Sequence, residues 1–179
     1  SFSEIYFIGF TMATYAMYEG KEIPAIIFSF PALALWFCDS CKNVMYWIIN
    51  HELGHIVNGD IDLEIDPGYK YEIPDYEERV RGEIPEREFK ADRFSWDTCS
   101  EEQKEGVKKE IPYLLALFEA VYGTKKSTRK FKIRAQALGF EIGSTTNEGL
   151  EVLEKEYNEA RERIVETNYE ELKALGLVS

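Results

Sequence analysis

Residues 49–60 read INHELGHIVNGD and contain the only two histidines of the chain, His51 and His55. Apolar residues recur at helical spacing through this stretch and the residues before it, and the pair Asn58–Gly59 is typical of a helix end. On a helix, side chains four residues apart lie on one face, so both imidazoles can reach a single ion. Glu52 falls beside that face. The sequence therefore predicts an amphipathic helix that carries a metal site.

The motif has the side chains of a catalytic zinc site. Zinc binds imidazole nitrogen readily, and a catalytic site keeps one position open for water. The arrangement H-E-x-x-H on one helix is typical of metallopeptidases, in which the glutamate acts as general base. Because the chain has no other histidine, the third protein ligand must be a carboxylate or a cysteine. The metzincin continuation is excluded, because Asn58 and Ile61 stand where it needs glycine and histidine.

A second predicted helix, beginning after Pro85, offers the third ligand. Within residues 87–97, REFKADRFSWD, Glu88 and Asp92 are one turn apart on a face that also carries apolar side chains. If Glu88 binds the metal, Asp92 can hydrogen-bond a ligand histidine from its outer side and hold its tautomer. The competing carboxylates lack an aspartate one turn later; they are Glu64, Glu77, Glu78 and Glu83.

The two motifs together resemble those of the gluzincins, in which H-E-x-x-H is followed by E-x-x-x-D. Over residues 40–98 the chain is similar to the compact intracellular members of that group, such as the Ste24-like and HtpX-like proteases and the Lit-like phage-exclusion peptidases. The resemblance implies a minimal zincin-like fold of the α+β class, mostly helical with a short β-sheet. It also implies a Zn²⁺ ion on His51, His55 and Glu88, with Glu52 as general base and Asp92 behind a ligand histidine.

Several relatives also have a His-Pro element with an arginine downstream. At the corresponding place this chain reads STRKFKIRAQAL and has no histidine, so the resemblance offers Arg129 or Arg134 for a role facing the substrate. A further donor must stabilise the oxyanion of peptide hydrolysis besides the metal. The span 67–85 is rich in Pro, Gly and Tyr, as expected of an active-site loop, and its candidates for that donor are Tyr69, Tyr71 and Tyr76.

Two apolar runs precede the motif helix. The run 5–18, IYFIGFTMATYAMY, predicts a buried helix, and the run 23–38, IPAIIFSFPALALWFC, predicts one or two buried strands. Each is shorter than the roughly 20 residues that a membrane span needs, so no span is predicted. The motif helix can be capped by Asp39, Ser40 or Asn43.

Two further patterns have simpler interpretations than metal or redox chemistry. Residues 60–66, DIDLEID, fail as a calcium loop because Ile65 and Tyr71 stand where glycine and glutamate are needed. Their alternation favours a strand with Ile61, Leu63 and Ile65 facing inward. The pair Cys38-x-x-Cys41 could serve redox chemistry or a second zinc together with Cys99, but buried small residues are favoured.

Length, net charge and cysteine count limit the domain organisation, binding partners and compartment that can be expected. The 179 residues fit one domain, 1–179, with a core at 23–122 and a helical C-terminal part at 123–179. From residue 110 onward the pattern predicts a helix at 110–122 and another, capped by Thr145 or Thr146, at about 145–167, with a basic stretch at 125–134 between them. A net charge of −12 argues against nucleic-acid binding, and three cysteines favour a reducing, cytoplasmic setting.

The sequence therefore predicts a zinc-dependent endopeptidase that hydrolyses peptide bonds of a protein or peptide substrate through a metal-activated water. Two alternatives stay open. A non-catalytic zinc-binding scaffold or sensor domain would have no use for Glu52 and would need a fourth ligand. An ImmA-like regulatory protease would be distinguished by a repressor as its substrate.

Overall fold

The computed structural model describes residues 11–63, 82–122 and 126–174. In chain order the elements are β1 (Thr11–Tyr18), β2 (Lys21–Phe28), α2 (Phe30–Trp36), the 3₁₀ turn η1 (Asp39–Cys41), α3 (Lys42–Val57), the 3₁₀ turn η2 (Asp60–Leu63), α5 (Glu86–Thr98), α6 (Glu101–Tyr122), α7 (Lys126–Ala137), α8 (Asn147–Thr167) and α9 (Tyr169–Ala174). Helices dominate, and the described strands form one antiparallel pair. The predicted α+β, mostly helical class is confirmed.

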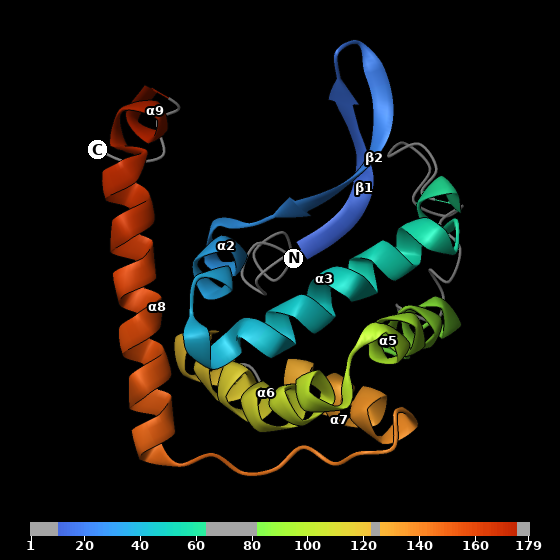
Figure 1. Ribbon diagram of the computed structural model, residues 1–179, viewed down its shortest axis with the longest axis vertical. Helices are drawn as coiled ribbons and strands as arrows, with labels where there is room; N and C mark the ends of the chain where they lie inside the picture. Colours follow the sequence, from blue (N-terminus) through green and yellow to red (C-terminus); the bar gives the residue numbers. More distant parts are fainter. Residues whose placement is uncertain (1–10, 64–81, 123–125, 175–179) are drawn as a thin grey trace.

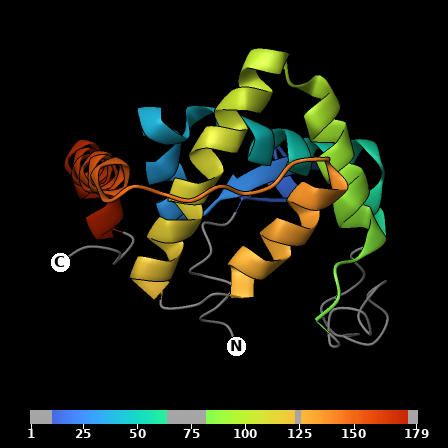
Figure 2. The same ribbon diagram turned by 90° about the horizontal axis from the view of Figure 1, so that it is seen from below.

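The helix α3, which carries the H-E-x-x-H motif, runs through the middle of the molecule (Figure 1). The hairpin of β1 and β2 rises above it, while α6 lies beneath it and α5 lies beside its C-terminal half. Helix α8 stands along the opposite side and packs against α2 and α6. Seen from below, residues 138–146 cross the underside of the molecule and connect α7 to α8 (Figure 2).

The N-terminal hairpin differs from the prediction. Strand β1 pairs with β2 from Thr11 opposite Phe28 to Tyr18 opposite Lys21. Glu19 and Gly20 form the turn with φ of 48° and 74°, as a two-residue hairpin turn of the I′ type requires. The helix predicted at 5–18 is therefore wrong over 11–18. The turn folds the chain back, so that each of these residues pairs with a residue of β2. Residues 5–10 lie outside the described part.

The second apolar run is half strand and half helix. β2 is a strand as predicted, but most of its residues are exposed rather than buried. The chain then leaves the sheet at Ser29, whose hydroxyl accepts a hydrogen bond from Ala32 N–H at 3.3 Å and caps helix α2. This local cap explains why residues after Phe28 form a helix instead of a second strand.

Helix α3 ends where predicted but is capped differently. At its C-terminus, Asn58 N–H donates to Gly54 O at 2.9 Å and Gly59 has a φ of 75°, which confirms the predicted end. At its N-terminus no predicted cap is used. Glu110 of α6 instead accepts from Val44 N–H and from the Asn43 side-chain amide, both at 2.8 Å. The cap therefore comes from another helix, 66 residues away.

Of the other predicted elements, some are confirmed and some differ from the prediction. Helix α5 follows Pro85 as expected, and Thr146 caps α8 by accepting from Gly149 N–H at 3.2 Å. Helix α6 begins earlier than predicted, at Glu101. Residues 60–63 form the turn η2, which contacts α3 and β1, rather than the start of a strand; Ile65 lies outside the described residues.

One hydrophobic cluster extends from α2 to α8. Trp47 and Met45 of α3, Ile111 and Leu114 of α6, and Leu153 of α8 are all essentially inaccessible to solvent within it. The three cysteines belong to the same cluster, as favoured from the sequence; they are Cys38, Cys41 and Cys99. Burial raises the pKa of the Cys38 thiol to about 12 and also raises those of Cys41 and Cys99, so these thiols are poor nucleophiles.

Among the described helices, none has a stretch that is both long enough and apolar enough to cross a membrane.

The cap on α3 can be tested by the substitution Glu110→Ala. Two donors at the helix start would lose their acceptor, so we expect the free energy of unfolding to fall by about 1–2 kcal/mol. Urea titration followed by circular dichroism measures this change. Glu105→Ala is the matched control, because Glu105 is an exposed glutamate of the same helix paired only with Lys108 one turn later. Equal stability of the two variants would contradict the capping role.

Candidate metal centre

The site begins with a close approach of two helices. Gly54, inside the H-E-x-x-H motif, faces Ala91 of α5, and a Cβ atom at Gly54 would lie 3.1 Å from Ala91 Cα and 3.2 Å from Ala91 O. Farther along the same interface, Ser95 Oγ donates to Trp47 O at 2.6 Å. A glycine inside a helix costs stability relative to alanine, and here its lack of a side chain lets α3 and α5 touch. This contact brings the first turn of α5 opposite the histidines.

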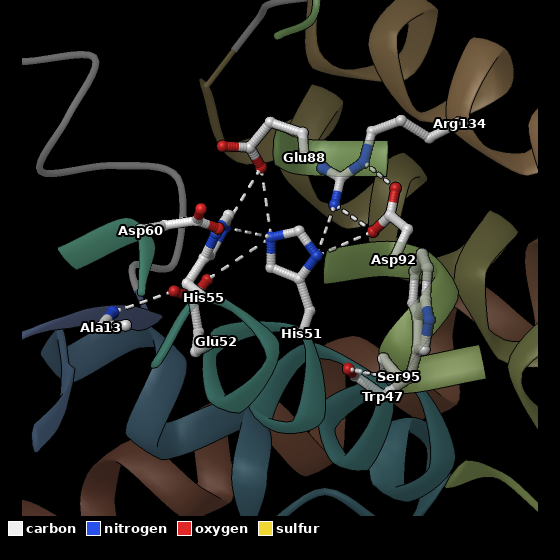
Figure 3. A network of polar contacts seen from close by, with 10 residues as sticks. All are labelled: Ala13, Trp47, His51, Glu52, His55, Asp60, Glu88, Asp92, Ser95 and Arg134. Carbon is white, nitrogen blue, oxygen red and sulfur yellow. Dashed lines mark hydrogen bonds and ion pairs between the residues drawn. The ribbon is translucent and has the colours of Figure 1, made fainter. Parts of the chain in front are cut away.

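The three predicted ligands meet at one place (Figure 3). Glu88 Oε2 lies 3.1 Å from His51 Nε2 and 3.6 Å from His55 Nε2, and the two Nε2 atoms are 3.1 Å apart. The two imidazoles are nearly perpendicular, with ring centroids 4.6 Å apart. Within the described residues this is the group of His, Cys, Asp and Glu side chains whose donor atoms converge closely enough to hold a metal ion.

Each histidine is oriented by a carboxylate on its other nitrogen. His51 Nδ1 lies 2.8 Å from Asp92 Oδ1, and His55 Nδ1 lies 2.8 Å from Asp60 Oδ2. An ionised carboxylate can only accept hydrogen bonds, so both Nδ1 atoms carry the hydrogen. Both Nε2 atoms thereby face Glu88, and with a metal bound they would present their lone pairs to it, in the tautomer that metal-ligating histidines use.

The donor spacing fits a tetrahedral metal site. Metal–ligand bonds of about 2.1 Å at tetrahedral angles put neighbouring donors roughly 3.4 Å apart. The observed separations of 3.1, 3.1 and 3.6 Å bracket that value. Two Nε2 lone pairs this close also repel unless a positive charge, either a proton or a cation, lies between them and the carboxylate. Among the described residues the group holds three donors, two imidazoles and one carboxylate.

The pKa values reflect the same demand for positive charge. Burial works against a charged His51, but hydrogen bonds to Asp92 and Glu88 outweigh it and raise the His51 pKa to about 9. For His55, burial is likewise outweighed by the hydrogen bonds to Glu88 and Asp60, and its pKa is raised. Burial alone would raise the pKa of Glu88, yet the two imidazoles hold it well below its usual range. Without a metal, His51 is therefore protonated at neutral pH and forms an ion pair with Glu88.

Glu52 lies beside the ligand group without belonging to it. Its Oε1 is 4.0 Å from His51 Nε2, and its Oε2 accepts a hydrogen bond from Ala13 N–H of β1 at 2.9 Å. Burial raises the pKa of Glu52, against the opposing effect of the neighbouring His51. A carboxylate with a raised pKa that lies beside the candidate metal ligands has the properties of a general base.

The two candidate arginines have different places. Arg134 of α7 donates from Nε and Nη2 to the two oxygens of Asp92, at 2.7 and 2.6 Å, so it lies behind His51. Arg129 of the same helix is exposed and makes no described contact with the site. Of the competing carboxylates, Glu83 is exposed and not part of the donor group. The remaining ones, and the three tyrosines, lie outside the described residues; they are Glu64, Glu77, Glu78, Tyr69, Tyr71 and Tyr76.

Two partners of the site were not predicted from the sequence. Asp60 was assigned to a strand, but it follows the helix end directly, and an acid five residues after His55 is a signal that could have found it. Ala13 was assigned to a helix and contributes only its backbone N–H, which no side-chain pattern reveals.

Comparison with known proteins adds no relative. No protein-family model matches the chain, and no curated protein or solved structure matches it. The resemblance to gluzincins therefore rests on the two motifs and their spacing alone.

The helix contact can be tested by Gly54→Ala. Alanine favours a helix by about 1 kcal/mol over glycine, but its Cβ would push α5 and Glu88 away from the histidines. We expect at least a roughly tenfold loss of affinity for zinc or cobalt, the scale on which disturbed metal surroundings act. Competition with a chromophoric chelator measures it. Gly143→Ala is the control, because a Cβ there meets nothing within 4 Å; equal affinity of the two variants would contradict the proposed constraint.

Proposed function

We propose that the protein is a zinc-dependent endopeptidase in which His51, His55 and Glu88 hold the metal and Glu52 is the general base. The observation that carries this proposal is the convergence of three donors with a buried fourth carboxylate beside them, 4.0 Å from the nearest ligand nitrogen. Two imidazoles and one carboxylate are a ligand set of catalytic rather than structural zinc.

Bound zinc would supply a Lewis acid that polarises the scissile carbonyl and lowers the pKa of a water molecule. Glu52 accepts the proton of the attacking water and passes it to the leaving nitrogen, for which its raised pKa is suited. Asp92 and Asp60 keep both Nδ1 atoms protonated, so that the histidines present lone pairs at Nε2.

The position of strand β1 supports the proposal that the substrate is a peptide. Within the described residues β1 pairs only with β2, and its other edge lies beside α3, where Ala13 N–H reaches Glu52. An extended peptide that adds to such an edge gains main-chain hydrogen bonds and passes next to the general base. A non-catalytic zinc domain is less favoured, because Glu52 would then be a buried carboxylate without a task.

Zinc content and hydrolysis test the two halves of this proposal separately. We expect one zinc per chain in the wild type and in Glu52→Gln, and much weaker binding in His51→Ala and Glu88→Ala. Only the zinc-loaded wild type is expected to cleave an unfolded protein such as casein or a complex peptide library, with cleavage read by mass spectrometry. Glu52→Gln should lose at least roughly a hundredfold in rate.

Three results would contradict the proposal. A folded wild type without zinc affinity would remove the metal site, and full activity of Glu52→Gln would remove the general base. A zinc-loaded wild type that cleaves no peptide of the library would favour the non-catalytic alternative. Glu83→Ala is the matched control for Glu88→Ala, because Glu83 lies nearby in the chain, is exposed and is not a member of the donor group.

Zinc uptake should release protons at neutral pH. The pKa of His51 is about 9 and that of His55 is also raised, so at pH 7 the metal must displace at least the proton of His51. Affinity for zinc should accordingly rise with pH up to about 9. Calorimetry in buffers of different ionisation enthalpy counts the protons, and we expect at least one per zinc; a value near zero would mean that the histidines are neutral before binding.

A further inference from the structure

The structure assigns Arg134 a positioning role: it holds the Asp92 carboxylate in the plane that fixes His51 as a metal ligand. This inference rests on the ligand set of the proposed function and deepens it. It also replaces the substrate-facing role expected for this arginine, because two of its nitrogens already bind Asp92.

The geometry of the pair is bidentate. Arg134 Nε donates to Asp92 Oδ2 at 2.7 Å and Nη2 donates to Oδ1 at 2.6 Å. Two parallel hydrogen bonds between planar groups fix both the position and the tilt of the carboxylate. Oδ1 is also the atom that accepts from His51 Nδ1, at 2.8 Å. The chain of contacts therefore runs from the guanidinium through one oxygen to the imidazole (Figure 3).

Asp92 needs such a partner because it is buried. Its side chain is 1% exposed, and a buried carboxylate held by a single hydrogen bond from His51 would be strongly disfavoured. Arg134 Nη2 also lies 3.2 Å from His51 Nδ1, but that nitrogen carries its own hydrogen and cannot accept. The arginine therefore acts on the histidine through Asp92 and not directly.

Arg134 is itself held in place by its own helix. Its guanidinium lies 5.0 Å from the ring centroid of Phe131, one turn earlier on α7, and Phe131 packs edge-on against Trp47 of α3. Nearby, Arg93 Nη2 donates to Ala137 O at 2.9 Å and joins α5 to the end of α7. The candidate metal centre therefore depends on a third helix, α7, whose Arg134 lies 42 residues after Asp92 in the chain.

A double-mutant cycle on zinc affinity tests this inference. The proteins are wild type, Arg134→Met, Asp92→Asn and the double variant, with affinity measured by chelator competition. We expect Asp92→Asn to weaken zinc binding by about 10- to 100-fold, as loss of such partners does, and Arg134→Met by roughly tenfold. In the Asp92→Asn background Arg134→Met should have almost no further effect, because its action passes through Asp92.

Three controls separate positioning from folding. Arg129→Met removes an exposed arginine of the same helix and should bind zinc as the wild type does. Arg93→Met removes a link between α5 and α7 and reports what looser docking of α7 alone does to zinc affinity. Arg134→Lys keeps the charge without the bidentate geometry and should show intermediate affinity. Visible spectra of the Co²⁺-loaded proteins report ligand geometry, and they should change for Arg134→Met and stay unchanged for Arg129→Met.

Wild-type affinity and an unchanged Co²⁺ spectrum in Arg134→Met would overturn the inference. So would an equal loss from Arg134→Met with and without Asp92, since the arginine would then act elsewhere. Full affinity of Arg134→Lys would reduce its role to charge alone and overturn the geometric assignment. If the wild type binds no zinc, the proposed function fails together with this inference; if the wild type binds zinc and only the cycle fails, the proposed function stands.

Discussion

At Gly54 the absence of a side chain lets α3 come close to the Ala91 backbone and the Phe94 ring of α5. The position of every ligand follows from this contact. His51 and His55 lie on the face of α3 that it covers, and Glu88 and Asp92 lie on the matching face of α5. A shift of a few tenths of an ångström between the helices would move the glutamate relative to both imidazoles at once. Packing and candidate chemistry therefore share one interface.

Around this interface the charges are strongly unbalanced. Four carboxylates surround two imidazoles; they are Glu52, Asp60, Glu88 and Asp92. Arg134 compensates one of them, and in the absence of a metal ion the raised pKa values of both histidines favour their protonation, which offsets part of the remaining negative charge. A divalent cation would offset the same negative charge, because one ion can bind both Nε2 lone pairs and a Glu88 oxygen together. The electrostatics and the donor spacing therefore favour the same occupant.

Sequence patterns predicted the helices of the site well and its supporting contacts poorly. The end of α3, the start of α5 and the cap of α8 are local signals carried by Asn58–Gly59, Pro85 and Thr146. The convergence of Glu88 on the histidines also followed from helical spacing and the motif resemblance. In contrast, the hairpin was missed because an apolar run with small residues suits either a helix or a strand, and pairing with β2 decided it.

The remaining errors concern contacts between residues far apart in the chain. The Glu110 cap, the Ala13 contact to Glu52 and the Arg134 pair join residues separated by 66, 39 and 42 positions. No periodicity or local spacing encodes such partners, and without an alignment of relatives nothing in one sequence identifies them. The sequence named Arg134 as a site residue, but only the structure revealed which group it touches.

The cap on α3 also bears on whether the segment with the two motifs could form the site without the rest of the chain. A segment spanning both motifs, 40–98, contains the predicted ligands and the base but lacks Glu110 and Arg134, which hold the start of α3 and the carboxylate behind His51. It also lacks Glu156 of α8, which accepts from Ser40 N–H at 3.1 Å just before α3. Transplanting the two motifs into another scaffold would carry over the ligands without the frame that aligns them. In this chain the residues needed to hold the site in place extend well beyond the two motifs by which it is recognised.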